Sequence, residues 1–236
     1  MNIKTRLEEV KQEYLARIHS GDGTLLHEVE RYLAAVQGKM LRPQLLLAAA
    51  ATLGPDVFRS RRTLLLAVAV EMLHNASLLH DDVVDHAADR RGRPSVNHRW
   101  SNAVAVLVGD YFLTLTMQLL HEANDADASD RINRTVAAMV EAELLAQELA
   151  TRTSAPSEIE SHTAYLRIID GKTARLFATA CALGNPAYEA FGLHYGRLFQ
   201  LRDDVADGEA TPYTEPLLAE EENTLRQLPP LPGFDL

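Results

Sequence analysis

Hydrophobic residues recur every three or four positions along most of this chain, which is the spacing of one face of an α-helix. The clearest example lies in 2–19, where apolar side chains return to one side of the predicted helix: Ile3, Leu7, Val10, Tyr14 (or Leu15) and Ile18. The same spacing predicts further helices over 24–36, from Pro43 to about residue 54, and over 57–85, 102–122 and 129–152, with others after Ser157 and after Asn185-Pro186. No segment has the alternation that is typical of a strand. The pattern therefore predicts an all-α protein.

Glycine and proline separate the predicted helices. We expect a break at 37–39, a loop over 86–100 that contains Gly92 and Pro94, and a kink at Gly171. No linker divides 1–207, which we expect to form a single helical domain. Residues 208–236 form a proline-rich, acidic tail, in which only 217–228 have a helical pattern. We expect this tail to be partly ordered at best.

The composition of the chain restricts the kinds of binding partner and the cellular compartment that we expect. A net charge of −10 argues against a nucleic-acid backbone as the partner, because no broad basic field is present. The single cysteine, Cys181, lies in an apolar run and fits a buried thiol in a reducing compartment. The N-terminal residues lack a signal peptide and no apolar run has the length of a bilayer span, so we expect a cytoplasmic protein with no transmembrane segment.

One short acidic pattern, DDxxD, occurs twice, at 81–85 and at 203–207, each time after an apolar stretch. The first and fifth positions of the pattern lie one helical turn apart on the same face. Like charges at that spacing destabilise a helix by a few tenths of a kcal/mol, so a repeated arrangement indicates a cation between them. Carboxylate oxygens with room for phosphate oxygens suit Mg²⁺. The alternative, two solvated acidic helix faces, fits less well with the apolar residues that precede each box.

Basic residues accompany the two acidic boxes. Lys39 and Arg42 lie at a predicted helix entrance, where free backbone N–H groups and the helix dipole favour an anion. Arg90 and Arg91 follow the first box, and Lys172 lies at another predicted helix start. Each of these alone is typical of a solvated side chain. Together with two metal boxes they indicate a diphosphate substrate, with metal on some oxygens and Arg or Lys on the others.

Over about 30–207 the sequence resembles the trans-isoprenyl diphosphate synthase (polyprenyl synthetase) family. The resemblance rests on GDY at 109–111 and on five blocks in the family's order: GKMLRP at 38–43, EMLHNASLLHDDVVD at 71–85, RRGRPS at 90–95, GKTA at 171–174 and FQLRDDVAD at 199–207. It implies an isoprenoid-synthase-type helical bundle with the two boxes facing each other across a central cavity. It also implies a Mg²⁺-dependent prenyltransferase that condenses isopentenyl diphosphate with an allylic diphosphate.

The resemblance assigns roles to the matching residues. It implies metal binding by the two boxes: Asp81, Asp82, Asp85, Asp203 and Asp204, with Asp207 less directly involved. It implies allylic diphosphate binding by Arg90, Lys172, Thr173 and Gln200, and isopentenyl diphosphate binding by Lys39, Arg42, His74 and Arg91. Lys172 and the first five aspartates are the expected catalytic residues. His74 by itself would suit a buried core position, but its place in the E-x-x-H block favours the substrate role. For His80, packing and a role in supporting the box both stay open.

The chain departs from the family's pattern in two places. Gln37 and Met40 stand where the family usually has a glycine and a basic residue, and no lysine follows Asp207 where the family supplies one. The family also continues through several further helices, so we expect one cavity wall to be shortened or supplied by a partner.

The leading prediction is a synthase, and the family resemblance implies that it is a homodimer. The apolar faces of 102–122 and 129–145 agree with this, because they exceed what one helical layer buries. The alternatives are a catalytically weak or regulatory subunit of a heteromeric prenyl synthase and a class I terpene cyclase. The first is opposed by two complete acidic boxes. The second is opposed by Lys39, Arg42 and His74, because a cyclase has no second diphosphate to hold.

Two small residues upstream of the first box, Ala76 and Ser77, bear on product length. In the family the product grows past this part of the helix, so small side chains predict a product longer than fifteen carbons, with Leu73 as the first bulky group. Alternatively, Ala76 and Ser77 only allow close helix packing, and Phe112 forms an earlier floor.

Overall fold

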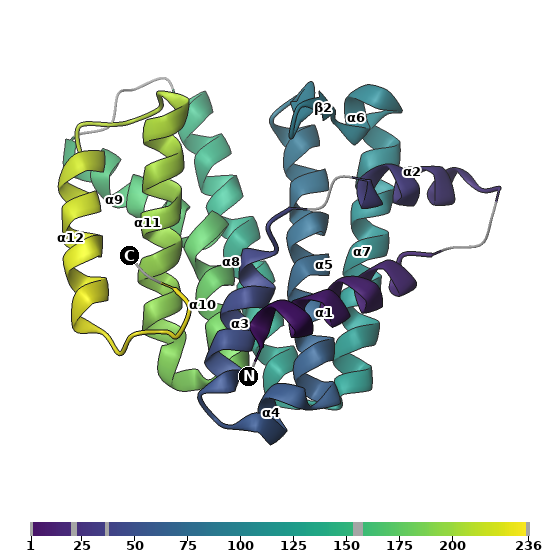
Figure 1. Ribbon diagram of the computed structural model, residues 1–236. Helices are drawn as coiled ribbons and strands as arrows, with labels where there is room; N and C mark the ends of the chain where they lie inside the picture. The colour runs from purple at the N-terminus through teal and green to yellow at the C-terminus, as the bar shows by residue number, and fades with distance from the viewer. Residues whose placement is uncertain (1, 20–22, 36–37, 153–157, 235–236) are drawn as a thin grey trace. The chain divides into compact units, whose positions relative to one another are not determined.

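Helices dominate the computed structural model, which describes residues 2–19, 23–35, 38–152 and 158–234 (Figure 1). The α-helices are α1 (Ile3–Arg17), α2 (Leu25–Ala34), α3 (Leu41–Ala51), α4 (Pro55–Arg59), α5 (Arg61–Val84), α6 (Val96–Arg99), α7 (Asn102–Ala123), α8 (Ala126–Thr151), α9 (Glu158–Ile169), α10 (Arg175–Gly184), α11 (Glu189–Asp207) and α12 (Thr214–Gln227). A π-helical turn, η1 (Asp170–Ala174), joins α9 to α10, and a 3₁₀ turn, η2 (Pro186–Tyr188), precedes α11. The all-α prediction is confirmed.

Three local features differ from the sequence prediction. The helix predicted over 57–85 begins at Arg61 instead, because the Ser60 side chain caps its first turn by accepting a hydrogen bond from the Thr63 backbone N–H. The predicted loop over 86–100 contains a small hairpin of β1 (Asp89–Arg90) and β2 (Arg93–Pro94). Its two turn residues, Arg91 and Gly92, have φ of 55° and 74°, as a two-residue hairpin turn requires.

The third difference is at Gly171, where the structure has the wider turn η1 in place of the expected kink. Two other expectations, the end of a helix at Val36 and the helix start at Ser157, lie outside the described residues.

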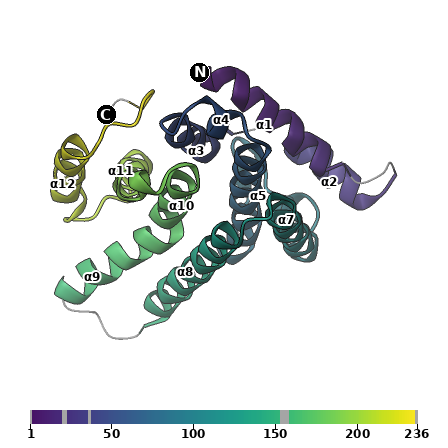
Figure 2. The same ribbon diagram turned by 90° about the horizontal axis from the view of Figure 1, so that it is seen from below.

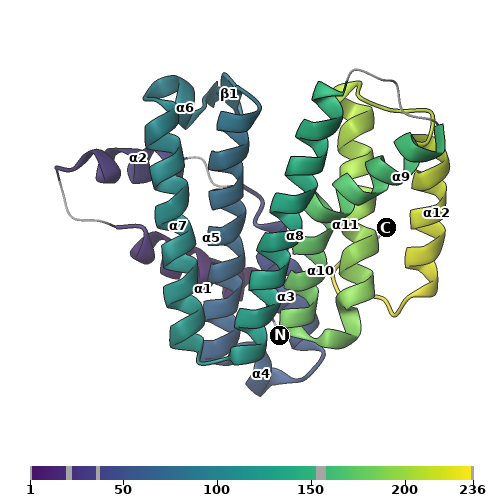
Figure 3. The same ribbon diagram turned by 180° about the vertical axis from the view of Figure 1, so that it is seen from behind.

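The chain divides into two compact units, and the first comprises Met1–Leu47 and Arg59–Asp125. Its centre is the long pair α5 and α7, which run alongside each other in Figure 3. Helix α1 packs on α5, and the Tyr14 ring meets the fully buried Phe112 ring edge-on at 6.4 Å. Arg6 of α1 also donates to the carbonyl oxygens of Arg59 and Ser60, so α1 holds the N-terminal end of α5.

The second unit comprises Ala48–Phe58 and Ala126–Leu236. Helices α10 and α11 lie side by side, with α12 on the other side of α11 (Figure 2). The α10–α11 contact is close because Gly192 and Gly196 face it: a Cβ on Gly192 would lie 2.6 Å from the Phe177 carbonyl oxygen. Such a contact permits no larger side chain without backbone movement.

The segment after the second box contributes to this second unit. Helix α12 covers nearly all of the predicted helical segment 217–228, and its Leu217 packs with Ile169 and Leu201 in a small buried cluster. The division of the chain at residue 207 stays a prediction.

Two helices, α5 and α7, are long and apolar enough to cross a membrane by length and composition, so the expected absence of such runs is not confirmed. In their most apolar stretches, 72% of α5 and 44% of α7 lie buried inside the structure. Core helices of soluble proteins meet the same criterion, so this evidence for a membrane span is weak.

Candidate functional site

The first acidic box lies at the C-terminal end of α5. Asp82 is buried and Asp81 half-buried, while Asp85 is exposed and forms the C-cap, its backbone N–H bonded to the Asp81 carbonyl at 2.8 Å. The last turn of α5 contains no basic residue. The negative end of the helix dipole therefore adds to the repulsion among the three carboxylates, which favours a bound cation.

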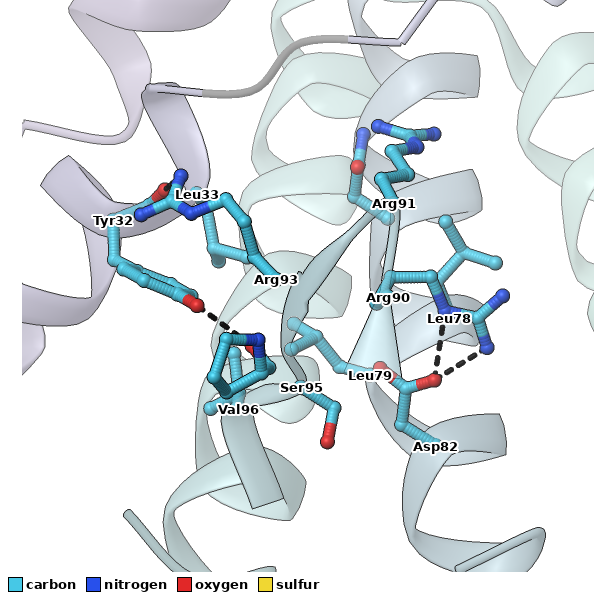
Figure 4. Close-up of a pocket in the computed structure, with 12 residues that line it drawn as sticks. Tyr32, Leu33, Leu78, Leu79, Asp82, Arg90, Arg91, Arg93, Ser95 and Val96 are labelled. Atoms are coloured by element: carbon cyan, nitrogen blue, oxygen red, sulfur yellow. Dashed lines mark hydrogen bonds and ion pairs between the residues drawn. The ribbon is translucent and has the colours of Figure 1, made fainter. Parts of the chain in front are cut away.

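The Asp82 carboxylate is paired with Arg90 from the hairpin that follows. Arg90 Nε donates to Asp82 Oδ1 at 2.8 Å, and Arg90 Nη2 contacts the same oxygen. Asn97 Nδ2 donates to the Asp82 carbonyl at 3.0 Å and so ties the end of α5 to the segment after the hairpin. Figure 4 shows Arg90 turned toward Asp82, whereas Arg91 points away from it. One residue predicted to bind diphosphate thus neutralises one predicted to bind metal.

The hairpin is also held from α2. Tyr32 Oη donates to the Pro94 carbonyl at 2.7 Å, and the Arg93 guanidinium lies 3.9 Å from the centre of the Tyr32 ring, a cation–π contact (Figure 4). These residues line one pocket together with Arg90 and Arg91. Because α2 fixes the hairpin, it also limits where the two arginines can reach.

A second basic group surrounds the buried Glu71 on α5. Burial lowers the pKa of Arg42 to about 10, with Glu71 opposing the change and Arg91 adding to it. Burial raises the pKa of Glu71, while Arg42 and Arg91 counteract the rise. Gly38 lies against Arg91, since a Cβ on Gly38 would fall 2.6 Å from Arg91 Nη2. The structure therefore brings Arg42 and Arg91 together around one carboxylate.

His74 lies one turn after Glu71 on the same helix. Burial lowers the pKa of His74 well below its usual value, and the nearby charges of Arg42, Arg91 and Arg90 lower it further. Its imidazole is therefore neutral at physiological pH. Lys39, the remaining residue of the predicted isopentenyl diphosphate site, is exposed.

His80, directly before the first box, packs against α7. Its Nε2 lies 3.3 Å from the Val106 carbonyl oxygen and 3.3 Å from Asp110 Oδ1. Gly109 leaves the space, because a Cβ there would fall 2.6 Å from His80 Cδ2. His80 therefore packs against α7. The glycine and the aspartate of the GDY segment form part of this contact.

The second acidic box ends α11 in the other unit. Asp204 is buried and its carboxylate is held from two sides: Tyr165 Oη donates to Oδ2, and Gln200 Nε2 donates to Oδ1 at 2.8 Å. Gln200 Oε1 in turn accepts from Thr173 Oγ1 at 2.7 Å. Asp203 and Asp207 are exposed, and the last turn of α11 also lacks a basic residue.

Tyr165, which sequence reasoning missed, belongs to this hydrogen-bonded chain. Burial raises its pKa to about 12, and the bond to Asp204 contributes to the rise. Tyr165 therefore stays protonated and able to donate. Its sequence signal was weak, because it lies outside every block that carries the family resemblance.

Lys172 is presented by the π-helical turn η1. Its Nζ lies 2.5 Å from Glu143 Oε2 on α8, another partner that sequence reasoning missed. Burial would raise the pKa of Glu143, but hydrogen bonds from Lys172 and Gln147 bring it below the usual value. Lys172 and Asp204 line one pocket, together with Tyr165, Ile168, Ile169, Thr173, Gln200 and Glu209.

Within the described residues, no group of three or more His, Cys, Asp and Glu side chains is gathered in a metal-binding arrangement. The chemistry of the boxes nevertheless fits a hard cation: each offers only oxygen donors at the negative end of a helix, with no basic residue in its last turn. In both boxes the middle aspartate is buried and held by a neighbour.

Comparison with known proteins identifies the family of this chain. A family model described as polyprenyl synthetase matches residues 23–216. The chain is 36% identical over 214 residues to the octaprenyl diphosphate synthase of Haemophilus influenzae, covering 86% of this chain and 62% of that protein. It is 34% identical over 215 residues to heptaprenyl diphosphate synthase component 2 of Geobacillus stearothermophilus, covering 87% and 64%.

A solved structure gives the same result for the fold. The polyprenyl synthase of Caulobacter crescentus CB15, in complex with calcium and isoprenyl diphosphate, superposes with a TM-score of 0.79 at 32% identity, covering 88% of this chain and 64% of that one. The chain thus spans less than two thirds of the length of each of these relatives.

The lowered pKa of His74 predicts a pH dependence of stability. The unfolded chain takes up a proton on this histidine near pH 6.5, which the folded protein does not. The contribution of neutral His74 is therefore fully present above about pH 6.5 and is lost as the pH falls, by at most about 1.4 kcal/mol per pH unit. Urea unfolding at pH 7.5, 6.5 and 5.5 measures it. His74→Gln should lose less free energy of unfolding than the parent over this range, and equal losses would contradict the lowered pKa.

Proposed function

Because the chain belongs to the polyprenyl synthetase family, we propose that it is a prenyltransferase that condenses isopentenyl diphosphate with an allylic diphosphate to give a longer trans-polyprenyl diphosphate. One observation carries the proposal. Each compact unit ends a long helix in a DDxxD box that lacks a basic residue in the last helical turn, and each places a cation beside that box. Arg90 is the cation in the first unit, and Lys172 shares a pocket with Asp204 in the second.

The carboxylates of each box would bind a divalent cation, and we propose Mg²⁺. The ligands would come from Asp81, Asp82 and Asp85 on one helix and from Asp203, Asp204 and Asp207 on the other. The calcium in the Caulobacter crescentus complex supports a divalent ion in this family. When bound, the ion supplies positive charge to the oxygens of a leaving diphosphate. The buried middle aspartates would keep their orientation through neighbours such as Gln200.

We propose that the allylic diphosphate contacts Arg90, Lys172, Thr173 and Gln200. Two of these are paired with carboxylates, Arg90 with Asp82 and Lys172 with Glu143. When the diphosphate binds, Arg90 and Lys172 exchange one anionic partner for another. Neither side chain has to be transferred from water for this contact, because each is already paired. The allylic carbon–oxygen bond breaks with its electron pair leaving on the diphosphate, which these donors stabilise.

Isopentenyl diphosphate would bind at Lys39, Arg42, His74 and Arg91. Glu71 keeps Arg42 and Arg91 close together, and neutral His74 adds a hydrogen-bonding group without a competing charge. The double bond of this substrate attacks the allylic carbon, and a proton from the adjacent carbon passes to the departing diphosphate. No side-chain nucleophile takes part.

A second candidate function is that of one component of a heteromeric prenyl synthase. The observation that favours it is the similarity to heptaprenyl diphosphate synthase component 2. In this case the chain would act with a different partner chain and show weak activity alone. An assay of the purified chain by itself separates the two candidates.

We further propose a homodimer in the cytoplasm, with α5 and α7 as core helices and not membrane spans. Large apolar side chains are exposed on α7 at Leu107 and Met117, and on α8 at Val140 and Leu144. Such exposure is typical of surfaces that another chain covers. Light scattering at micromolar concentration should give twice the mass of the chain, and Leu107→Lys should shift the mass toward that of the monomer. A monomeric parent would contradict the dimer, while an unchanged dimer in the variant would remove α7 from the interface.

The first test of function is a purified-protein assay with isopentenyl diphosphate, an allylic primer and Mg²⁺. We expect turnover that chelation by EDTA abolishes. Asp81→Ala and Asp203→Ala should lower kcat by orders of magnitude while leaving the helical circular dichroism of the protein intact. Asp127→Ala, in the first turn of α8, is the control for activity. Near-normal turnover in either box variant would contradict the metal assignment of that box.

Variants of the basic residues test the two substrate sites. Arg42→Ala should raise the KM for isopentenyl diphosphate by roughly 10- to 150-fold, which corresponds to about 1.5–3 kcal/mol for a charge-assisted contact. Lys172→Ala should act chiefly on the KM for the allylic substrate, and the exposed Lys4→Ala should change neither. Equal effects of both site variants on both substrates would contradict the division.

The burial of Ala76 changes the prediction about product length, which placed both Ala76 and Ser77 beside the growing chain and expected Ala76→Phe to shorten the product. Ala76 is fully buried and lies one turn before His80, whereas Ser77 is partly exposed and lies one turn before Asp81. We therefore propose that Ser77 faces the growing chain and that Ala76 serves packing. Chromatography of dephosphorylated products should give parent chains longer than fifteen carbons and shorter ones from Ser77→Phe. Ala76→Phe should instead lower stability by about 1–3 kcal/mol through overpacking. A parent that stops at fifteen carbons would contradict the proposal.

A further inference from the structure

A network of charged side chains joins the last helix, α12, to the π-helical turn η1. Arg197 on α11 lies at its centre and donates from Nε and Nη2 to the two carboxylate oxygens of Asp170, at 2.5 and 2.8 Å. The third nitrogen, Nη1, donates to Glu221 Oε1 on α12 at 3.1 Å. The other oxygen of Glu221 lies 2.5 Å from His194 Nδ1. One guanidinium thus bridges two carboxylates, those of Asp170 and Glu221.

Glu221 is a buried charge, with only 3% of its surface exposed. A carboxylate removed from water is strongly unfavourable unless its oxygens are paired. Arg197 and His194 provide these partners, both from α11. Hydrogen bonding to Asp170, together with the charge of Glu221, raises the pKa of Arg197, so the guanidinium remains charged. The contact between α11 and α12 therefore depends on ionic groups as well as on Leu217.

Asp170 is the first residue of η1, and Lys172 and Thr173 follow within the same turn. A π-helical turn is an uncommon piece of backbone that is found mostly as a single turn within α-helices, often at functional sites. On one side, Gly171 lies against α8, where a Cβ would fall 2.8 Å from the Ala138 carbonyl oxygen. On the other side, the two-pronged Arg197–Asp170 contact holds the turn to α11. The directions of Lys172 and Thr173 follow from these two constraints.

We propose that Glu221 and Arg197 are positioning residues for the allylic diphosphate site, acting through Asp170 to fix the turn that presents Lys172 and Thr173. The inference rests on the proposed function, because it assumes that Lys172 and Thr173 bind the diphosphate. It gives α12 a role in the site although none of its residues lines the Lys172 pocket. Lys172 and Thr173 therefore depend on a helix that follows the second acidic box.

The chain offers a matched control for Glu221. The neighbouring Glu222 pairs with Arg202 across the same two helices at 2.8 Å, but half of the Arg202 side chain and a third of the Glu222 side chain are exposed. An exposed pair of this kind contributes little to stability. Glu221→Gln and Glu222→Gln each remove one negative charge, at neighbouring positions of α12. Only Glu221 contacts Arg197, so only Glu221→Gln should disturb η1.

Steady-state kinetics of both variants, well below their melting temperatures, test the proposal. Glu221→Gln should raise the KM for the allylic substrate roughly tenfold, since a misplaced binding group weakens a contact by about this factor or more. The KM for isopentenyl diphosphate should stay within about twofold of the parent value, as befits a local effect. Glu222→Gln should change neither. An active parent with an unchanged allylic KM in Glu221→Gln, or with equal rises for both substrates, would overturn the proposal.

Amide hydrogen exchange over η1 provides a readout that does not depend on activity. The amides of 170–174 should exchange faster in Glu221→Gln than in the parent, and at the parent rate in Glu222→Gln. Asp170→Asn breaks the same chain of contacts at its other end and should give the same result, which keeps the test available if Glu221→Gln does not fold. If the parent lacks transferase activity, the proposed function has failed, and unchanged exchange in Asp170→Asn would then overturn the positioning role separately.

Discussion

The structure depends on a single electrostatic constraint, the accumulation of carboxylates at the C-terminal ends of two helices. In α5 and in α11, three aspartates meet the negative end of the helix dipole in a last turn without a basic residue. Each middle aspartate is buried, so it needs a donor: Arg90 for Asp82, and Tyr165 with Gln200 for Asp204. The hairpin after α5 supplies Arg90, α9 supplies Tyr165, and α11 itself supplies Gln200. Much of the local structure thus provides hydrogen-bond donors for the buried carboxylates of the two boxes.

The basic side chains of the candidate site are paired as well. Arg90, Arg42 and Lys172 each lie near a carboxylate, namely Asp82, Glu71 and Glu143. Under the proposed function, a site built this way keeps its charges ordered and close to neutral until the diphosphate binds. It favours a highly charged ligand that brings its own cation, because a weakly charged competitor cannot replace the internal pairs.

The sequence predicted the parts of this arrangement that are local in the chain. The 3.6-residue period located most of the helices, and the i, i+4 spacing identified both acidic boxes before any contact was known. Glu143 and Tyr165 were missed because their partners lie 29 and 39 residues away along the chain, at Lys172 and Asp204. Glu71 lay inside a recognised block, yet a carboxylate one turn before His74 gives no sign of being buried beside Arg42. Pairings of this kind follow from tertiary packing, which periodicity does not encode.

The π-helical turn η1 sets the rotation between α9 and α10, and with it the direction of Lys172. A π-turn holds one more residue than an α-helical turn over the same rise, so Asp170–Ala174 corresponds to a one-residue insertion in an otherwise continuous α9–α10 helix. Deleting one residue there would restore regular geometry and rotate everything on one side relative to the other by about 100°. Lys172 and Thr173 would then lose their common direction with Gln200. The irregularity sets the rotational phase between two helical segments, and natural variants of this region should change residue identity far more readily than residue number.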